Sequence, residues 1–128
     1  MSRDFLDASA LLALIQDEPG ADEVRAAVHR GVSISAVNFA EVVSKLVSLG
    51  LPEDDAVAAA SIPDVAIVDL SADVATTAGQ RHGHLRQQGI SLADVICLES
   101  ARAEGVRVLT ADRTWPSVAP DVDILLIR

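Results

Sequence analysis

The segment 89–115 constrains the fold of this chain more than any other. Its first part predicts a largely apolar helix that carries Asp94 in its first turn and ends at Gly105. The short run 106–109 then predicts a buried strand, and Asp112 follows closely after it. Ligands of open α/β sheets bind beyond the carboxyl ends of such strands. Asp94 and Asp112 are therefore candidates for one site.

The rest of the chain alternates apolar, strand-like runs with helical segments. Strands are predicted at 3–7, 31–37, 65–70, 106–109 and 123–127, helices at 8–15, 21–30, 38–49, 51–60, 71–88 and 91–104, and a loop at 116–120. The alternation predicts a single α/β domain over residues 1–128, in three layers, with a central and mainly parallel sheet of four or five strands. A chain of 128 residues buries roughly two thirds of its unfolded surface, so it needs no disulfide or structural metal to fold.

Composition excludes several classes of protein. Cys97, the one cysteine, lies in an apolar segment and is expected to be a buried core residue, and no Cys/His spacing suggests zinc. No apolar stretch approaches the ~18 residues of a membrane helix and no signal peptide is visible, so we expect a cytoplasmic protein without a membrane partner. The formal charge of −9 argues against passive binding to nucleic acid.

Two further acids follow the first two predicted strands. Asp7 ends the first strand, and Glu41 lies in the first turn after the second. Each also has a local interpretation, Asp7 as a helix N-cap and Glu41 as the acid of a capping box begun by Asn38 or as a partner of Lys45. The carboxyl ends of parallel strands meet at one edge of a sheet, which favours a shared site over these local roles.

Four carboxylates at one sheet edge predict a site for a hard cation. Like charges raise one another's pKa unless a cation lies between them. Oxygen ligands without His or Cys select Mg²⁺ or Mn²⁺, and such an ion can ionise a water and stabilise charge on a phosphoryl oxygen. The spacing of the acids therefore predicts a metal-dependent phosphate enzyme. The four acids are Asp7, Glu41, Asp94 and Asp112.

The predicted helix 71–88 carries the clustered basic and imidazole residues of the chain. The simplest interpretation is an exposed face, and the alternative is a contact surface for RNA phosphate or for a partner. His82 and His84 lie two residues apart, on different sides of a helix, which disfavours a metal pair. In so acidic a chain, RNA contacts would depend on local arginines. The candidates are Arg81, Arg86 and Arg113.

Four motifs resemble those of one family across nearly the whole chain. They are F-L-D-A-S-A-L-L-A-L-I, S-A-V-N-F-A-E-V-V-S-K-L, S-L-A-D-V-I-C-L-E-S-A and V-L-T-A-D-R-T-W, in this order. The sequence resembles the PIN-domain ribonucleases, and in particular the VapC toxins of bacterial toxin–antitoxin (VapBC) pairs. The resemblance implies a PIN-like α/β/α fold and a Mg²⁺-dependent endoribonuclease, in which Mn²⁺ can substitute.

The same resemblance implies roles for individual residues and partners. Asp7 and Asp94 would bind the metal directly, Glu41 would bind or position the attacking water, and Asp112 would complete the site. Ser9 and Thr110 match small hydroxyl positions that support the acids. The implied partners are an RNA substrate, a VapB-type antitoxin and a second copy of the chain.

Two alternatives come from other functional classes. A receiver domain also has an acidic sheet edge and Mg²⁺, but it needs a phosphoacceptor Asp after the third strand and a Lys after the fifth. The chain has Asp69 near its third strand, yet its one lysine, Lys45, lies in a predicted helix. The second alternative is a catalytically silent PIN-like binding module, which the presence of all four acids argues against.

Overall fold

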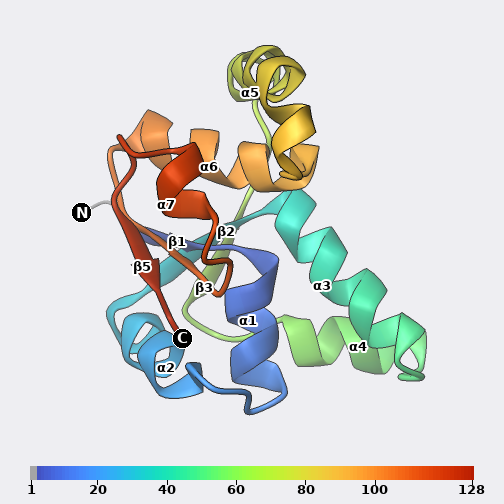
Figure 1. The fold of residues 1–128 in the computed structure, drawn as a ribbon. Coiled ribbons are helices and arrows are strands. Elements are labelled where there is room, and N and C mark those ends of the chain that lie inside the picture. The colour runs from blue at the N-terminus through green and yellow to red at the C-terminus, as the bar shows by residue number, and fades with distance from the viewer. Residues whose placement is uncertain (1–2) are drawn as a thin grey trace.

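The five strands of the computed structural model, which describes residues 3–128, form one parallel sheet (Figure 1). The order across the sheet is β3-β2-β1-β4-β5, so β1 is the central strand. The strands are β1 (Asp4–Leu6), β2 (Val32–Ser35), β3 (Val65–Val68), β4 (Val108–Thr110) and β5 (Ile124–Leu126). Each lies within about two residues of its predicted position, and the prediction of a parallel sheet is confirmed.

Helices cover both faces of this sheet, and Figure 1 shows α5, α6 and α7 on one side and α1, α2 and α4 on the other. They are α1 (Ala8–Ile15), α2 (Ala21–Arg30), α3 (Ala36–Ser48), α4 (Glu53–Ala60), α5 (Ala72–Leu85), the 3₁₀ turn η1 (Arg86–Gln88), α6 (Leu92–Glu104) and α7 (Trp115–Val118). Within residues 3–128, no helix has the length and apolar character needed to cross a bilayer.

Alternate side chains of the central strands pack into two separate cores. Leu6 and Leu109 are fully buried with side chains of α1 to α4, whereas Phe5 and Val108 are fully buried with side chains of α5, α6 and α7. Successive strand residues point to opposite faces, so a continuous apolar run is what a sheet covered on both sides requires. The two cores confirm the predicted three-layer α/β/α arrangement.

The strand order places a crossover beside the central strand. The chain runs outward from β1 through β2 to β3 and then returns to place β4 on the other side of β1. Open α/β sheets bind ligands at the carboxyl edge of such a switch point. A receiver-type sheet has the order 2-1-3-4-5, so the observed order rules out the receiver alternative.

Two local predictions were wrong. Residues 115–118 form helix α7 where a loop was expected, because Trp115 is fully buried and anchors the turn, and Pro116 needs no hydrogen-bonded N–H in a first helical turn. Helix α3 begins two residues before Asn38, because the hydroxyl of Ser35 accepts the Asn38 N–H at 3.0 Å and caps the helix. The capping box proposed for Asn38 and Glu41 is therefore not formed.

Gly20 should be far more sensitive to substitution than Gly50. Both have positive φ, +99° and +106°, but a Cβ on Gly20 would lie 2.6 Å from the carbonyl oxygen of Ile127, whereas a Cβ on Gly50 meets nothing within 4 Å. We expect Gly50→Ala to cost about 1 kcal/mol of backbone strain and Gly20→Ala roughly 2 kcal/mol more. Urea denaturation of both variants measures the difference, and equal losses would contradict the close packing of α2 against the end of β5.

Candidate functional site

The carboxylate of Asp7 lies at the carboxyl end of the central strand and is almost completely buried, with 4% of the residue exposed. Its Oδ1 accepts hydrogen bonds from the Ser9 hydroxyl at 2.7 Å and from the Ala10 N–H at 2.8 Å. Its Oδ2 accepts from the Thr110 hydroxyl at 2.6 Å. Asp7 is therefore the N-cap of α1, as the local interpretation predicted, and it also lies at the predicted sheet edge.

Two hydroxyls connect Asp7 to the segment after β4. Thr110 accepts the Asp112 N–H at 3.0 Å while it donates to Asp7, and Ser9 accepts the Ala111 N–H at 3.0 Å while it donates to Asp7. Ser9 thus binds the neighbouring loop as well as the acid. These bonds hold the backbone of Asp112 close to the Asp7 carboxylate across the crossover between β1 and β4.

Asn38 connects Glu41 to the helix that carries Asp94. The Asn38 side chain is fully buried, and its Nδ2 donates to Glu41 Oε1 at 2.8 Å and to the carbonyl of Ala93 at 3.2 Å. The first bond orients the exposed Glu41 carboxylate, and the second ties α3 to the first turn of α6. This role of Asn38 was not predicted, because the sequence pattern around it is typical of a helix cap.

Asp94 occupies the third position of α6 and forms a capping box with Ser91. The Asp94 N–H donates to the Ser91 hydroxyl at 3.1 Å, and the Ser91 N–H donates to the Asp94 carboxylate at 3.3 Å. The second bond is long, and Asp94 is only half-buried. The capping role therefore leaves part of the Asp94 carboxylate available to another ligand.

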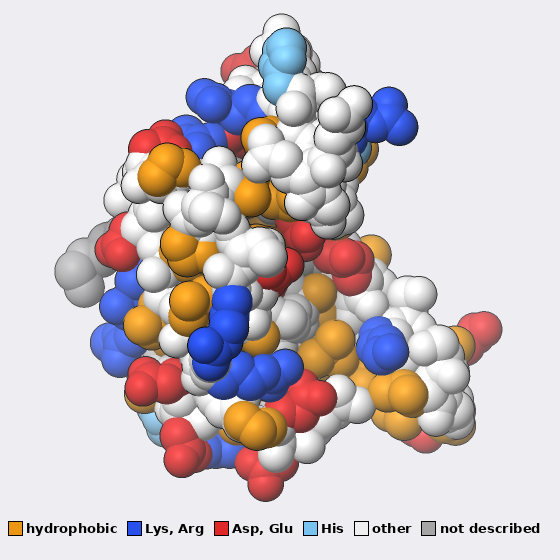
Figure 2. Space-filling view, in the orientation of Figure 1, with side chains coloured by type: hydrophobic (Ala, Val, Ile, Leu, Met, Phe, Trp, Pro, Cys, Tyr) orange, Lys and Arg blue, Asp and Glu red, His pale blue; other side chains and the backbone are white. Residues whose placement is uncertain are grey.

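Electrostatic coupling shows that these acids share one region. Burial, with a smaller contribution from the charge of Asp94, raises the pKa of Asp7 to about 6 against the lowering effect of its hydrogen bonds. Burial also raises the pKa of Asp94, as does the charge of Asp112. The pKa of the Cys97 thiol is raised by burial and then by the charges of Asp7, Asp94 and Glu41. Figure 2 shows acidic side chains gathered in the hollow between the α5–α6 lobe and the α3–α4 lobe.

The donor chemistry of this region fits a hard divalent ion bound by few protein ligands. In the described part of the chain, no group of three or more His, Cys, Asp or Glu side chains is arranged to hold a metal ion. Mg²⁺ commonly uses one or two carboxylates and keeps several waters. The buried Asp7 carboxylate and the half-buried Asp94 carboxylate, which repel each other, would satisfy that requirement.

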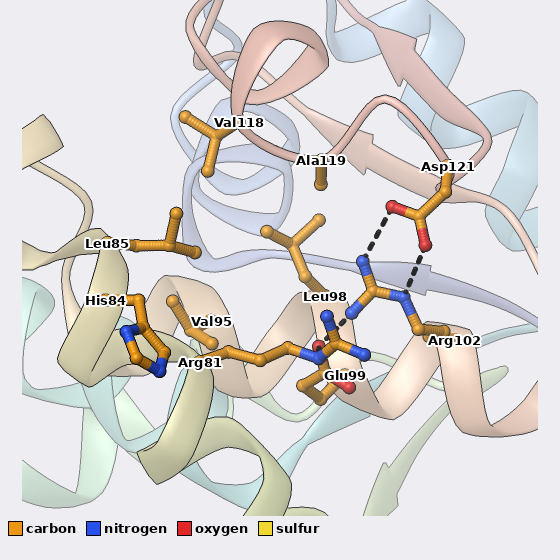
Figure 3. Close-up of a pocket in the computed structure, with 10 residues that line it drawn as sticks. All are labelled: Arg81, His84, Leu85, Val95, Leu98, Glu99, Arg102, Val118, Ala119 and Asp121. Atoms are coloured by element: carbon orange, nitrogen blue, oxygen red, sulfur yellow. Dashed lines mark hydrogen bonds and ion pairs between the residues drawn. The ribbon is translucent and has the colours of Figure 1, made fainter.

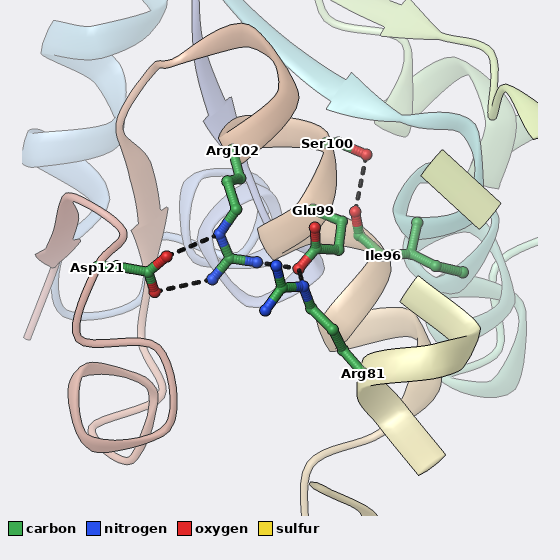
Figure 4. Close-up of polar contacts among 6 residues, drawn as sticks. All are labelled: Arg81, Ile96, Glu99, Ser100, Arg102 and Asp121. Atoms are coloured by element: carbon green, nitrogen blue, oxygen red, sulfur yellow. Dashed lines mark hydrogen bonds and ion pairs between the residues drawn. The ribbon is translucent and has the colours of Figure 1, made fainter. Parts of the chain in front are cut away.

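The three arginines that were predicted from the sequence as candidate RNA contacts lie in different environments. Arg86 lies in η1 and Arg113 directly follows Asp112, and both are exposed. Arg81 instead pairs through Nε with Glu99 at 2.8 Å (Figure 4). Glu99 is a buried acid that the sequence analysis did not single out, and it also binds Arg102.

Comparison with known proteins agrees with this architecture. A family model described as PIN domain matches residues 5–120. No curated protein sequence matches the chain.

Several solved structures share the fold. A chain of the DNA-bound VapBC from Salmonella typhimurium has a TM-score of 0.79 and 19% identity, with 100% of both chains covered. A chain of FitAcB from Neisseria gonorrhoeae has a TM-score of 0.69 and 23% identity, with 96% of both chains covered. VapC20 from Mycobacterium tuberculosis, described as a Sarcin-Ricin loop cleaving toxin, has a TM-score of 0.66 and 19% identity, covering 81% of this chain and 85% of its own.

Burial of Asp7 predicts a pH-dependent stability that Asp7→Asn removes. The unfolded chain releases this proton near pH 3.8 and the folded protein near pH 6, so the unfolding free energy of the metal-free protein falls as pH rises through this window. The shift corresponds to about 3 kcal/mol. Asparagine caps a helix as well as aspartate. In EDTA, the unfolding free energy of Asp7→Asn relative to wild type should therefore rise by up to about 3 kcal/mol when the pH is raised from 4 to 7.5.

Denaturant melts at both pH values measure this gain. The exposed Asp69→Asn, which lies at the same sheet edge two strands away, is the matched control and should follow wild type. A loss of stability in Asp7→Asn at pH 7.5 would mean that the carboxylate acts mainly as a structural cap.

Proposed function

The chain belongs to the PIN domain family, and on that premise we propose that it is a metal-dependent endoribonuclease, the toxin of a VapBC-type toxin–antitoxin pair. The observation that supports this most is the Asp7 carboxylate at the β1–β4 crossover, whose pKa is raised by burial and, to a smaller extent, by the charge of Asp94. A carboxylate kept dry next to a second carboxylate is strongly disfavoured unless a cation or proton compensates it.

In this proposal Asp7 and Asp94 hold a Mg²⁺ ion, for which Mn²⁺ can substitute. The bound ion supplies a more acidic water and charge stabilisation for the phosphoryl oxygens of RNA. Thr110 and Ser9 fix the Asp7 carboxylate through the bonds described above, so that it needs no reorganisation when the ion binds. Asp112, whose N–H is anchored on Thr110, completes the negative field.

Glu41 is the residue that we assign to the attacking water. Its carboxylate is exposed, and Asn38 holds one of its oxygens at 2.8 Å, which leaves the other free to accept a proton from a water. Because Asn38 also binds the carbonyl before Asp94, it sets the position of Glu41 relative to the proposed metal ligands. Phosphodiester hydrolysis by a positioned water needs both a group that accepts the proton of the water and a metal ion held at a fixed distance from that group.

The toxin assignment and the partners are inferred from the structural relatives. The compared structures include VapBC complexes, and VapC20 is described as cleaving the sarcin–ricin loop. By analogy we propose RNA as the substrate, a VapB-type antitoxin as the partner, and a homodimer of the chain. A groove beside Glu41, with a volume of about 370 Å³ between α1 and α3, supports a partner segment at the site.

A silent binding module is the competing proposal, and metal dependence distinguishes the two. EDTA should abolish cleavage of total RNA by the purified, partner-free chain, and Mg²⁺ or Mn²⁺ should restore it. Asp7→Asn and Asp94→Asn should lower the rate at least about a hundredfold, whereas the matched Asp69→Asn should not change it. Cleavage that persists in EDTA would refute the metal mechanism, and no cleavage under any condition would favour the binding module.

Inhibition by the antitoxin should compete with the metal. An arginine of the partner can bond two carboxylates where the ion would lie, while apolar side chains pack along α1 and α3. Raising Mg²⁺ at constant ionic strength should therefore weaken inhibition of the chain by its proposed VapB-type antitoxin. Inhibition that is insensitive to Mg²⁺ would mean that the partner blocks RNA sterically.

A further inference from the structure

A second recess, separate from the acids, lies between α5, α6 and α7 (Figure 3). Its volume is about 210 Å³, and its apolar wall consists of side chains from all three helices. Pockets for whole small ligands are commonly about 300–1,000 Å³, so this one fits a single flat ring system rather than a complete nucleotide. The apolar residues of the wall are Leu85, Val95, Leu98 and Val118.

A charged cluster forms the polar wall of this cavity. Glu99 Oε1 forms an ion pair with Arg81, whose Nε lies 2.8 Å away, and accepts a hydrogen bond from Arg102 (Figure 4). Arg102 is fully engaged, because its Nε and second terminal nitrogen bind Asp121 at 3.0 and 2.9 Å. Two arginines and two acids make the cluster neutral, so it has little attraction for a free anion.

The cluster nevertheless leaves hydrogen-bonding groups open. Among residues 3–128, the two terminal nitrogens of Arg81 have no partner, and Arg81 is half exposed. Glu99 Oε2 also has no hydrogen-bond partner in this range. It must still be accessible to solvent, because the one fully buried side-chain polar atom without a partner among residues 3–128 is Trp115 Nε1. An ion-pair cluster that only joins the helices would need neither the free Arg81 nitrogens nor the free Glu99 oxygen. A polar ring of a ligand could bind both, because they offer a pair of hydrogen-bond donors beside an acceptor.

We propose that this cavity binds a guanine base of single-stranded RNA. Guanine presents N7, O6 and N1–H in sequence along its edge, which matches two donors from Arg81 and one acceptor from Glu99. Adenine has a donor where O6 would be, and the pyrimidines lack N7. Unpaired bases of RNA are recognised in this way, by hydrogen bonds on their edges and packing on their faces.

The cavity lies close to the acidic site on the same helix. Leu98, in its wall, lies four residues after Asp94 and so on nearly the same side of α6, whereas Glu99 lies about 8 Å along the helix axis from Asp94 and roughly 140° around it. A strand with a phosphate at the acids can therefore place a nearby base in the cavity. This step rests on the proposed nuclease function, while base binding itself does not.

Binding of free nucleotides tests the cavity without catalysis. In EDTA, the four ribonucleoside 5′-monophosphates are titrated into the chain and followed by amide NMR shifts. GMP should bind saturably, shift amides of α5 and α6 around Arg81 and Glu99, and bind roughly tenfold tighter than AMP. Arg81→Met, and Val118→Trp, which fills the cavity and spares the charged cluster, should abolish it. Gln80→Met, an exposed neighbour on α5, is the matched control.

Cleavage of a random single-stranded RNA pool then tests the link to RNA. Wild type and Gln80→Met should enrich guanine at one fixed position from the cut, and Arg81→Met and Val118→Trp should lose that enrichment. If GMP fails to bind, or if the enrichment survives in both cavity variants, the proposal is wrong. GMP binding without guanine enrichment would assign the cavity to a free nucleotide and also overturn it. If wild type binds GMP but cleaves no RNA, the nuclease function fails and base binding stands.

Discussion

Desolvation of the Asp7 carboxylate is the constraint on which the rest of this structure depends. The central position of β1 buries the residue that follows it, and three neighbouring groups donate to its oxygens. Those bonds lower the pKa of Asp7, yet burial outweighs them and holds it near 6. The folded chain thus stores an unfavourable charge at the switch point of the sheet. A bound cation would relieve it, which links the fold directly to the proposed chemistry.

The surrounding acids are held by polar contacts that cross between elements. Thr110 joins β4 to Asp7, and Asn38 joins α3 to α6, so the four acids are positioned by side chains that carry no charge. These uncharged contacts would stay in place if the acids changed protonation or bound the proposed ion. A network of this kind is what preorganised electrostatic catalysis requires.

The sequence predicted the parallel sheet and the three layers because apolar runs and helix caps report burial directly. It did not predict the strand order, since no local sequence pattern shows on which side of β1 each later strand will pair. Asn38 was misassigned because Ser35 and Asn38 are both good helix caps. In the structure Ser35 is the cap, and the Asn38 side chain instead donates to the distant carbonyl of Ala93. Glu99 was overlooked because its local (i,i+3) pair with Arg102 is typical of an exposed helix face, and Arg81 joins it only when α5 packs on α6.

The central claim is that the crossover carboxylates together form a divalent-ion site. Titration of Mn²⁺ into the metal-free chain, with free Mn²⁺ followed by electron paramagnetic resonance, measures this directly. We expect saturable binding to wild type and to Asp69→Asn, and binding weakened at least about tenfold in both Asp7→Asn and Asp94→Asn. Equal Mn²⁺ affinity in wild type and in these two variants would contradict it.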